Sequence, residues 1–151
     1  KYLEWGADRI ILGTAAINNP SFTKEMIRNF GSSIAIGVDA RDGYVAIQGW
    51  TKATDVKAVS FCLALQDAGV KTIIYTDISK DGLLQGTNLD AYRDLRQRLP
   101  EVNIIASGGI CSIKDLIALR DMGIHGAIIG KAIYENRLSL MGAIAITAVE
   151  R

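Results

Sequence analysis

Two glycine-rich segments have the residue types that suit anion binding. Ser107-Gly108-Gly109 follows one apolar run, and Gly130-Lys131-Ala132 follows the next. Backbone N–H groups in such turns point toward a ligand when a helix begins beyond them. Glycine has no side chain, so the ligand can approach this backbone closely. Two such turns after successive runs therefore predict a phosphate site, although each glycine could serve only a tight turn. Gly13-Thr14, after an earlier run, is a weaker candidate for a second anion site.

Carboxyl groups that follow two other apolar runs are candidates for proton transfer. Asp39 ends the apolar segment 34–38, and an apolar environment favours the protonated carboxyl that a general acid needs. Asp81 lies beyond Thr76, whose hydroxyl could bond a substrate or hold a carboxylate. Structural roles remain open for all three: Asp39 as a loop cap or ion-pair partner, Thr76 as an ordinary sheet residue, and Asp81-Gly82 as a turn.

The segment between Asp39 and Thr54 is long for a loop between a strand and a helix. It contains the turn signal Asp42-Gly43 and then Gly49-Trp50, which indicates a small excursion over the end of the sheet. Trp50 could stack there on a planar heterocycle or simply pack the loop down. The sequence contains no zinc-ligand spacing, Walker loop or dinucleotide fingerprint, so we expect no metal site.

Five short apolar runs must position these residues. Because they are continuous rather than alternating, they are typical of parallel strands covered on both faces. They are residues 9–12, 34–38, 72–75, 103–106 and 126–129. Capping and stop signals predict helices between and after them, at about 20–30, from Thr54 to about 68, 89–99, 113–122 and about 138–149.

The runs begin about 23 to 38 residues apart, which is the length of one βα unit. This α/β pattern predicts a parallel sheet, either a doubly wound open sheet or part of a (β/α)8 barrel. Polar or glycine residues follow every run, which favours the barrel, because a doubly wound sheet gathers its ligand-binding residues at one switch point. A complete barrel needs about 250 residues, so five units would be its carboxyl-terminal part.

The composition excludes several classes of protein. The 151 residues carry 17 Lys+Arg against 16 Asp+Glu, which is too balanced for a nucleic-acid binder, and 49% are hydrophobic, which is too many for a disordered chain. No stretch approaches the ~20 apolar residues of a membrane helix. Cys62 and Cys111 are too few for a disulfide framework, so we expect a cytoplasmic protein. Lys1–Gly6 is typical of the last turn of a helix and indicates a piece of a longer chain.

Three groups of motifs resemble one family. They are Gly37-Val38-Asp39-Ala40-Arg41-Asp42-Gly43 running to Gly49-Trp50, Tyr75-Thr76-Asp77-Ile78-Ser79-Lys80-Asp81-Gly82-Leu83-Leu84-Gln85-Gly86, and Ala106-Ser107-Gly108-Gly109 with Gly130-Lys131-Ala132. In order and spacing they are similar to the phosphoribosylformimino-5-aminoimidazole carboxamide ribotide isomerase family of histidine biosynthesis. The resemblance extends over essentially the whole chain. The cyclase that follows in the pathway shares the barrel, but the Gly-Trp loop and the Asp-Gly-x-x-x-Gly segment look like the isomerase.

The resemblance implies that residues 1–151 are the carboxyl-terminal portion of a single (β/α)8 TIM-barrel domain, about its fourth to eighth βα units. It implies an Amadori rearrangement of an aminoaldose to an aminoketose, with no metal or organic cofactor. It makes Asp39 the general acid, Thr76 and Asp81 further catalytic-site residues, and Trp50 an aromatic over the substrate. The bisphosphorylated ribotide substrate then explains two opposed anion sites, formed by Gly13 and Thr14 and by Ser107, Gly108, Gly109, Gly130 and Lys131.

The family's general base is an aspartate at the end of the first barrel strand, and the resemblance implies that this strand lies outside the chain; Asp8 precedes a strand and does not match it. We therefore expect the remaining amino-terminal portion of the barrel as a partner, no activity from the fragment alone, and self-association through its open sheet edges. No nucleic-acid or membrane partner is expected. The alternatives are a dual-substrate isomerase that also acts on phosphoribosyl anthranilate, a non-catalytic phosphate-binding half-barrel, and a purely structural fragment.

Overall fold

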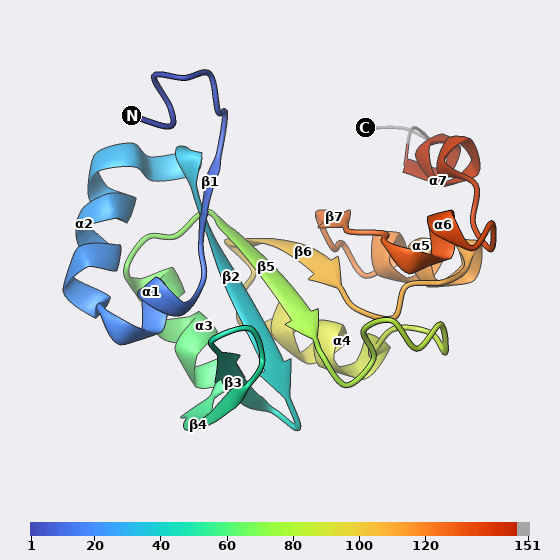
Figure 1. Ribbon diagram of the computed structural model, residues 1–151, viewed down its shortest axis with the longest axis horizontal. Helices are drawn as coiled ribbons and strands as arrows, with labels where there is room; N and C mark the ends of the chain where they lie inside the picture. Colours follow the sequence, from blue (N-terminus) through green and yellow to red (C-terminus); the bar gives the residue numbers. More distant parts are fainter. Residues whose placement is uncertain (148–151) are drawn as a thin grey trace.

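Five parallel strands alternate with helices in the computed structural model of the protein, which describes residues 1–147 (Figure 1). The strands pair successively, each parallel to the next. They are β1 (Ile10–Leu12), β2 (Ile34–Arg41), β5 (Thr72–Asp77), β6 (Asn103–Ser107) and β7 (Gly126–Ala127). Each of the five apolar runs thus contains a strand, as predicted, although β7 is shorter than its run.

The order of these strands in the sheet follows their order in the chain. A doubly wound sheet reverses its strand order at a switch point, and the parallel strands of residues 1–147 show no reversal. The described part of the chain is therefore a mixed α/β structure wound in one direction, and the doubly wound alternative is wrong for it.

Three of the predicted helices begin at side-chain caps. The Asn19 side chain accepts a hydrogen bond from the Phe22 N–H, the Asn88 side chain accepts one from Ala91, and Ser112 forms a capping box with Asp115. The helices are α1 (Thr14–Asn18), α2 (Pro20–Phe30), α3 (Ala58–Asp67), α4 (Leu89–Arg98), α5 (Ile113–Asp121), α6 (Lys131–Tyr134) and α7 (Leu140–Thr147), with a 3-10 turn at Gly31–Ser33. Helices α1 and α6 were not predicted, and Val149, the expected end of the last helix, lies outside the described residues.

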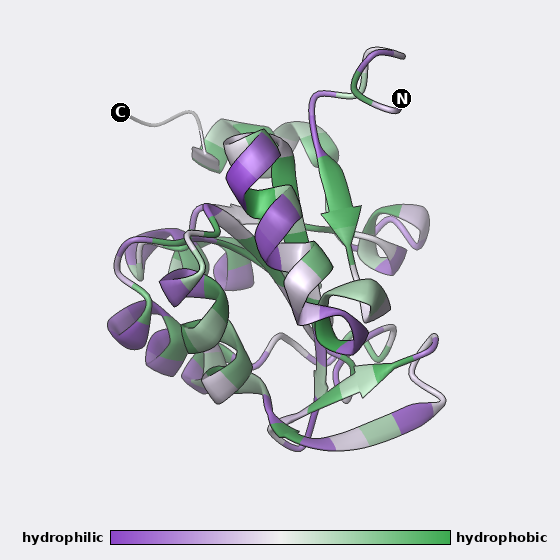
Figure 2. Ribbon diagram, turned by 90° about the vertical axis from the view of Figure 1, so that its left-hand side faces the viewer, coloured by the Kyte–Doolittle hydropathy of each residue, from purple (hydrophilic) through white to green (hydrophobic). Residues whose placement is uncertain are grey.

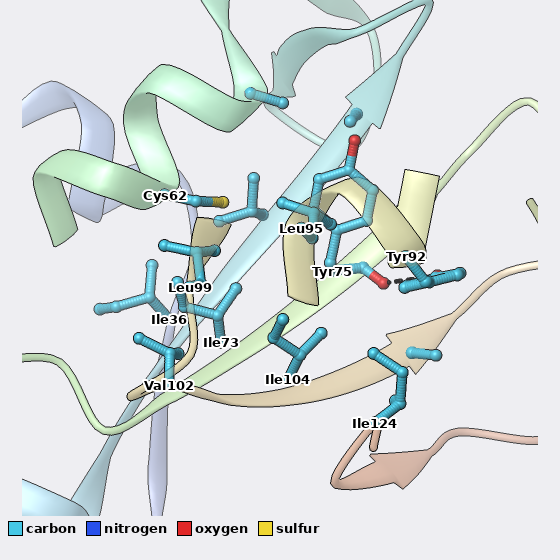
Figure 3. Close-up of a cluster of buried hydrophobic side chains, with 14 of the residues drawn as sticks. Ile36, Cys62, Ile73, Tyr75, Tyr92, Leu95, Leu99, Val102, Ile104 and Ile124 are labelled. Carbon is cyan, nitrogen blue, oxygen red and sulfur yellow. Dashed lines mark hydrogen bonds between the residues drawn. The ribbon is translucent and has the colours of Figure 1, made fainter. Parts of the chain in front are cut away.

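The hydrophobic core lies between the helices and one face of the sheet (Figure 3). Side chains alternate between the faces of a strand, so Ile73 and Tyr75 of β5 face the helices while Thr76 faces the opposite side. The Tyr75 ring meets the Tyr92 ring of α4 edge to face, with centroids 5.9 Å apart. Figure 2 looks onto the outer side of α2, where polar residues predominate. The helices thus fix the strands from one side and leave the strand ends free for a site.

The excursion after Asp39 is a hairpin of β3 (Tyr44–Ile47) and β4 (Lys52–Lys57). Strand β3 runs antiparallel to β2 at Asp39–Arg41, whereas β1 pairs with β2 at Ile34–Ile36. Since β5 occupies the other edge of β2, β1 and β3 share one edge. The hairpin therefore lies directly beyond the carboxyl end of β1.

The predicted start of a helix at Thr54 is wrong. Thr54 and Val56 belong to β4, and the Thr54 hydroxyl donates to the Val45 carbonyl oxygen at 2.8 Å. The Ala58 N–H donates to the Gly43 oxygen at 2.9 Å, which keeps the chain extended until α3 begins. Pairing with β3 overrides the helical spacing of Val56 with the apolar residues of α3.

Residues 1–6 form a helical turn that ends at Gly6, as predicted: the Trp5 N–H donates to the Lys1 oxygen at 3.0 Å, four residues earlier. Gly6 has a φ of 92°, and the Ala7 N–H beyond it donates back to the Tyr2 oxygen at 3.2 Å, which is the pattern of a helix carboxyl-terminal cap. Within residues 1–147, every helix is too short or too polar to cross a membrane.

Candidate functional site

The register of the sheet places three of the predicted site residues in one row. Asp39 of β2 is the partner of Thr76 of β5, and Thr76 is the partner of Ser107 of β6. Paired residues of neighbouring parallel strands lie about 4.8 Å apart and point to the same face. Thr76 is buried, while Asp39 and Ser107 are half-buried. A carboxyl and two hydroxyl groups thus line the carboxyl ends of adjacent strands.

Trp50 lies against the first member of this row. Its indole Nε1 donates to Asp39 Oδ2 at 2.9 Å. The chain reverses there because Gln48, Gly49 and Trp50 all adopt positive φ, with values of 56°, 62° and 71°. The tip of the β3–β4 hairpin therefore folds back over the end of β2, and the Trp50 ring remains partly exposed above it.

Gly13 and Thr14 lie on the β1 side of Asp39. A cavity of about 30 Å³ is lined by Gly13, Thr14, Asp39 and the hairpin tip. The Thr14 hydroxyl accepts a hydrogen bond from the Gln48 N–H at 3.1 Å. This space is small, and the hairpin tip closes it through that bond. The structure brings Gly13 and Thr14 to Asp39, and their anion site stays a prediction.

A larger cavity lies at the other end of the row. It has a volume of about 170 Å³ and combines both glycine-rich turns with the loop that carries Asp81. Its lining includes Asp81, Gly82, Ser107, Gly108, Gly109, Gly130 and Lys131. The Lys131 ammonium group donates to the Gly82 carbonyl oxygen at 3.1 Å, which links the second turn to the Asp81 loop. Backbone N–H groups, a cation and a carboxylate therefore surround one space.

The two glycines of the first turn are needed for a reason that the sequence does not reveal. Both have positive φ, and both are buried. A Cβ on Gly108 would lie 2.4 Å from the Asp77 oxygen, and one on Gly109 would lie 2.5 Å from the Gly86 oxygen. The expected reason was close approach of a ligand or a tight turn. In the structure, the missing side chains also make room for the loop that follows β5.

Two further polar residues support the row and were not among the predicted site residues. The buried Tyr92 hydroxyl accepts from the Ser107 N–H at 3.0 Å and lies within hydrogen-bond distance of the Ser107 and Tyr75 carbonyl oxygens. Burial raises the pKa of Tyr92 to about 12. The buried Asp77 carboxylate accepts hydrogen bonds from Ser79 and Asn88, which lie at the two ends of the next loop. Tyr92 occupies an apolar helix position, so its sequence pattern indicates only a core residue.

The other titratable candidates lie away from the row. His125 is exposed just before β7, at the amino end of that strand. Cys62 is buried in α3, and burial raises its pKa to about 12. No group of three or more His, Cys, Asp or Glu residues within 1–147 is arranged to hold a metal ion.

The chain is similar to proteins of histidine biosynthesis. Residues 1–139 match the family described as "Histidine biosynthesis protein". A 1-(5-phosphoribosyl)-5-((5-phosphoribosylamino)methylideneamino)imidazole-4-carboxamide isomerase of Brachyspira hyodysenteriae is 51% identical over 146 residues, which cover 97% of this chain and 61% of that protein. The isomerase of the same name from Clostridium acetobutylicum is 48% identical with the same coverage.

A third isomerase of this name, from Listeria monocytogenes, is 42% identical over 148 residues and is also covered to 61% of its length. The chain thus spans about three fifths of the length of the curated relatives that it matches. The family match extends over nearly all of the described residues, including every strand of the site. The chain therefore belongs to the family of histidine biosynthesis proteins.

Proposed function

We propose that the protein containing this chain is the aldose–ketose isomerase of histidine biosynthesis. In this proposal it converts the phosphoribosylformimino-5-aminoimidazole carboxamide ribotide to its phosphoribulosyl isomer by an Amadori rearrangement. The names of the relatives support the proposal. The observation that carries it is the row of Asp39, Thr76 and Ser107, which runs between the two predicted anion sites.

The rearrangement needs an acid and a base. Asp39 protonates the furanose ring oxygen, so that the C1 imine forms as the ring opens. A base then removes the proton at C2 of the protonated imine, which gives an enolamine. Protonation at C1 and loss of the proton from the C2 hydroxyl then yield the ketose. Thr76, next to Asp39 in the row, and Asp81, from the neighbouring loop, contact the reacting part of the substrate. Trp50 covers its heterocycle from the hairpin tip.

The substrate of this proposal carries a phosphate group at each end. The larger cavity, with Gly108, Gly109, Gly130 and Lys131, binds one of them, and Gly13 with Thr14 binds the other. Binding at the second site displaces the hairpin tip, because the Gln48 N–H now occupies the Thr14 hydroxyl there. The same movement would take the Trp50 indole off Asp39 and leave the acid free to reach the ring oxygen.

In this proposal the five βα units are the fourth to eighth units of a (β/α)8 barrel. The general base and the first three units belong to the part of the relatives' length that this chain does not span. The chain alone would bind phosphate esters without turning them over, and its open edge strands β1 and β7 would associate with those units or with a second copy.

The decisive experiment assays the complete protein with the ribotide substrate and, separately, with phosphoribosyl anthranilate. Turnover of the first substrate supports the proposal, and turnover of both identifies a dual-substrate isomerase. Residues 1–151 alone should show no turnover, but inorganic phosphate should raise their melting temperature. If the complete protein binds the ribotide without converting it, the isomerase assignment is wrong and the protein is a phosphate-binding module.

A further inference from the structure

Asp77 ends β5 one residue after Thr76, but its carboxylate faces the helix side and binds both ends of the following loop. Oδ1 accepts from the Ser79 N–H at 3.0 Å and from the Ser79 hydroxyl at 2.5 Å, and Oδ2 accepts from Asn88 Nδ2 at 2.7 Å. Only 7% of the residue is exposed. One buried carboxylate thus closes the loop of residues 78–88 at its base.

The orientation of the Asn88 amide is fixed independently. Its Oδ1 accepts from the Ala91 N–H at 3.2 Å as the cap of α4, so its Nδ2 must point to Asp77 as a donor. Asn88 and Ser79 therefore present three N–H or O–H groups to position 77. A carboxylate accepts from all three, whereas an Asn amide would turn its NH₂ group toward a donor in either orientation.

The far side of the same loop rests on the glycine turn of the larger cavity. The Thr87 hydroxyl donates to the Gly108 oxygen at 2.8 Å, and the Gly86 oxygen lies where a side chain of Gly109 would begin. The Asp77 main chain itself packs against Gly108 and accepts from the Lys80 N–H at 3.1 Å. Asp81 is exposed in the middle of this loop and lines the cavity, so the loop backbone decides where its carboxylate lies.

We infer that Asp77 is a positioning residue for the reaction, which holds the Asp81 loop in register with the Gly108-Gly109 turn. This inference rests on the proposed function only for the effect on turnover. Asp77 touches no substrate, because Thr76 of the same strand faces the site and Asp77 faces away. Its carboxylate acts through Ser79 and Asn88 on the loop, and through the loop on Asp81.

The test is a double-mutant cycle in the complete protein with Asp77→Asn and Asp81→Asn. Asp77→Asn should lower kcat by about tenfold to hundredfold, because a buried donor–donor contact opens the loop, while KM changes by less than about threefold. In the Asp81→Asn background the same change should lower kcat by less than about twofold. Asp67→Asn, at an exposed position at the end of α3, is the matched control and should leave kcat unchanged.

A second variant keeps the inference testable if Asp77→Asn does not fold. Asn88→Ser retains an oxygen to cap α4 but loses the Nδ2 group that reaches Asp77, so it should reproduce the kcat loss with an intact helix. Hydrogen exchange supplies a readout that does not depend on turnover: in both variants the amides of residues 79–88 should exchange at least about tenfold faster, while those of β2 and β5 do not change.

Equal loss of kcat in both backgrounds, or unchanged exchange in residues 79–88, would overturn the positioning role of Asp77. A wild-type protein that does not turn over the ribotide would overturn the proposed function instead. In that case the exchange measurement still decides whether Asp77 holds the loop.

Discussion

The Trp50 indole Nε1 donates a hydrogen bond of 2.9 Å to Oδ2 of Asp39. The bond joins the tip of the β3–β4 hairpin to the end of β2, eleven residues earlier in the chain. A hydrogen bond to a carboxylate is stronger than one between neutral groups. This bond therefore holds the hairpin tip against the side chain of the proposed acid, Asp39.

The first prediction separates the ring of Trp50 from its N–H group. Trp50→Phe keeps an aromatic face but loses the bond to Asp39, whereas Trp50→Ala loses both. If the ring covers the substrate heterocycle, Trp50→Ala should raise KM about tenfold and Trp50→Phe less than about threefold, since stacking on a base is worth about 1–3 kcal/mol. Steady-state kinetics of the complete protein measure both, with Trp5→Phe as the control in the exposed amino-terminal turn. An unchanged KM in Trp50→Ala would show that the ring only packs the loop.

The second prediction concerns the proposed acid. Asp39→Asn preserves the shape of the side chain and an acceptor for Trp50 but cannot deliver a proton. We expect kcat to fall by about 10²- to 10⁴-fold, the usual contribution of a general acid, with KM nearly unchanged. Asp55→Asn, at an exposed position of β4, should have no effect. A fully active Asp39→Asn protein would mean that another group supplies the proton.

The third prediction compares two glycines of the larger cavity. Gly109 has a φ of +76°, and a Cβ there would lie 2.5 Å from the Gly86 oxygen and 2.8 Å from the Lys80 Cβ. Gly130 has a φ of −110°, and its Cβ would meet no atom within 4 Å. Gly109→Ala should therefore lower the free energy of unfolding by about 2–4 kcal/mol, from overpacking and backbone strain together. Gly130→Ala should lower it by less than about 1 kcal/mol, and urea unfolding of the complete protein distinguishes the two.

The fourth prediction is a loss of stability at alkaline pH. Burial raises the pKa of Tyr92 from 10.0 to about 12. Below pH 10 the hydroxyl is protonated in both the folded and the unfolded chain. Between pH 10 and 12 only the unfolded chain ionises, so the free energy of unfolding should fall as the pH rises, by about 2 kcal/mol from this group.

Tyr92→Phe tests this assignment. At pH 7 it should be less stable by about 1–3 kcal/mol, because the Ser107 N–H loses its acceptor. Its decline above pH 10 should be shallower than that of the wild type. Tyr134→Phe, which changes an exposed ring, should match the wild type at every pH. Equal slopes for Tyr92→Phe and the wild type would contradict the assignment.

The strands and most helices could be predicted from the sequence because their signals are local. Each buried strand is a continuous apolar run, and Asn19, Asn88 and Ser112 are side-chain caps next to the helices that they begin. The row of Asp39, Thr76 and Ser107 follows from the same information, because residues that end successive parallel strands meet at one edge.

What could not be predicted depends on contacts between distant segments. Thr54 is a typical helix cap, and Val56 has helical spacing with Val59 and Leu63. Pairing with β3 nevertheless makes Thr54 and Val56 part of a strand. The sequence left Trp50 with two possible roles, and neither included the bond to Asp39. Asp77 gained its role only through Asn88, whose side chain also caps α4. The loop that joins these two residues has no periodic pattern from which its path could be deduced.

The contact between Gly86 and Gly109 has a practical consequence for anyone altering the specificity of this protein. Gly109 cannot accept a side chain while the loop that carries Gly86 keeps its path. Positions 86 and 109 should therefore be randomised together in a library, since single-site scans at position 109 would reject substitutions that a shift of the Gly86 backbone would tolerate.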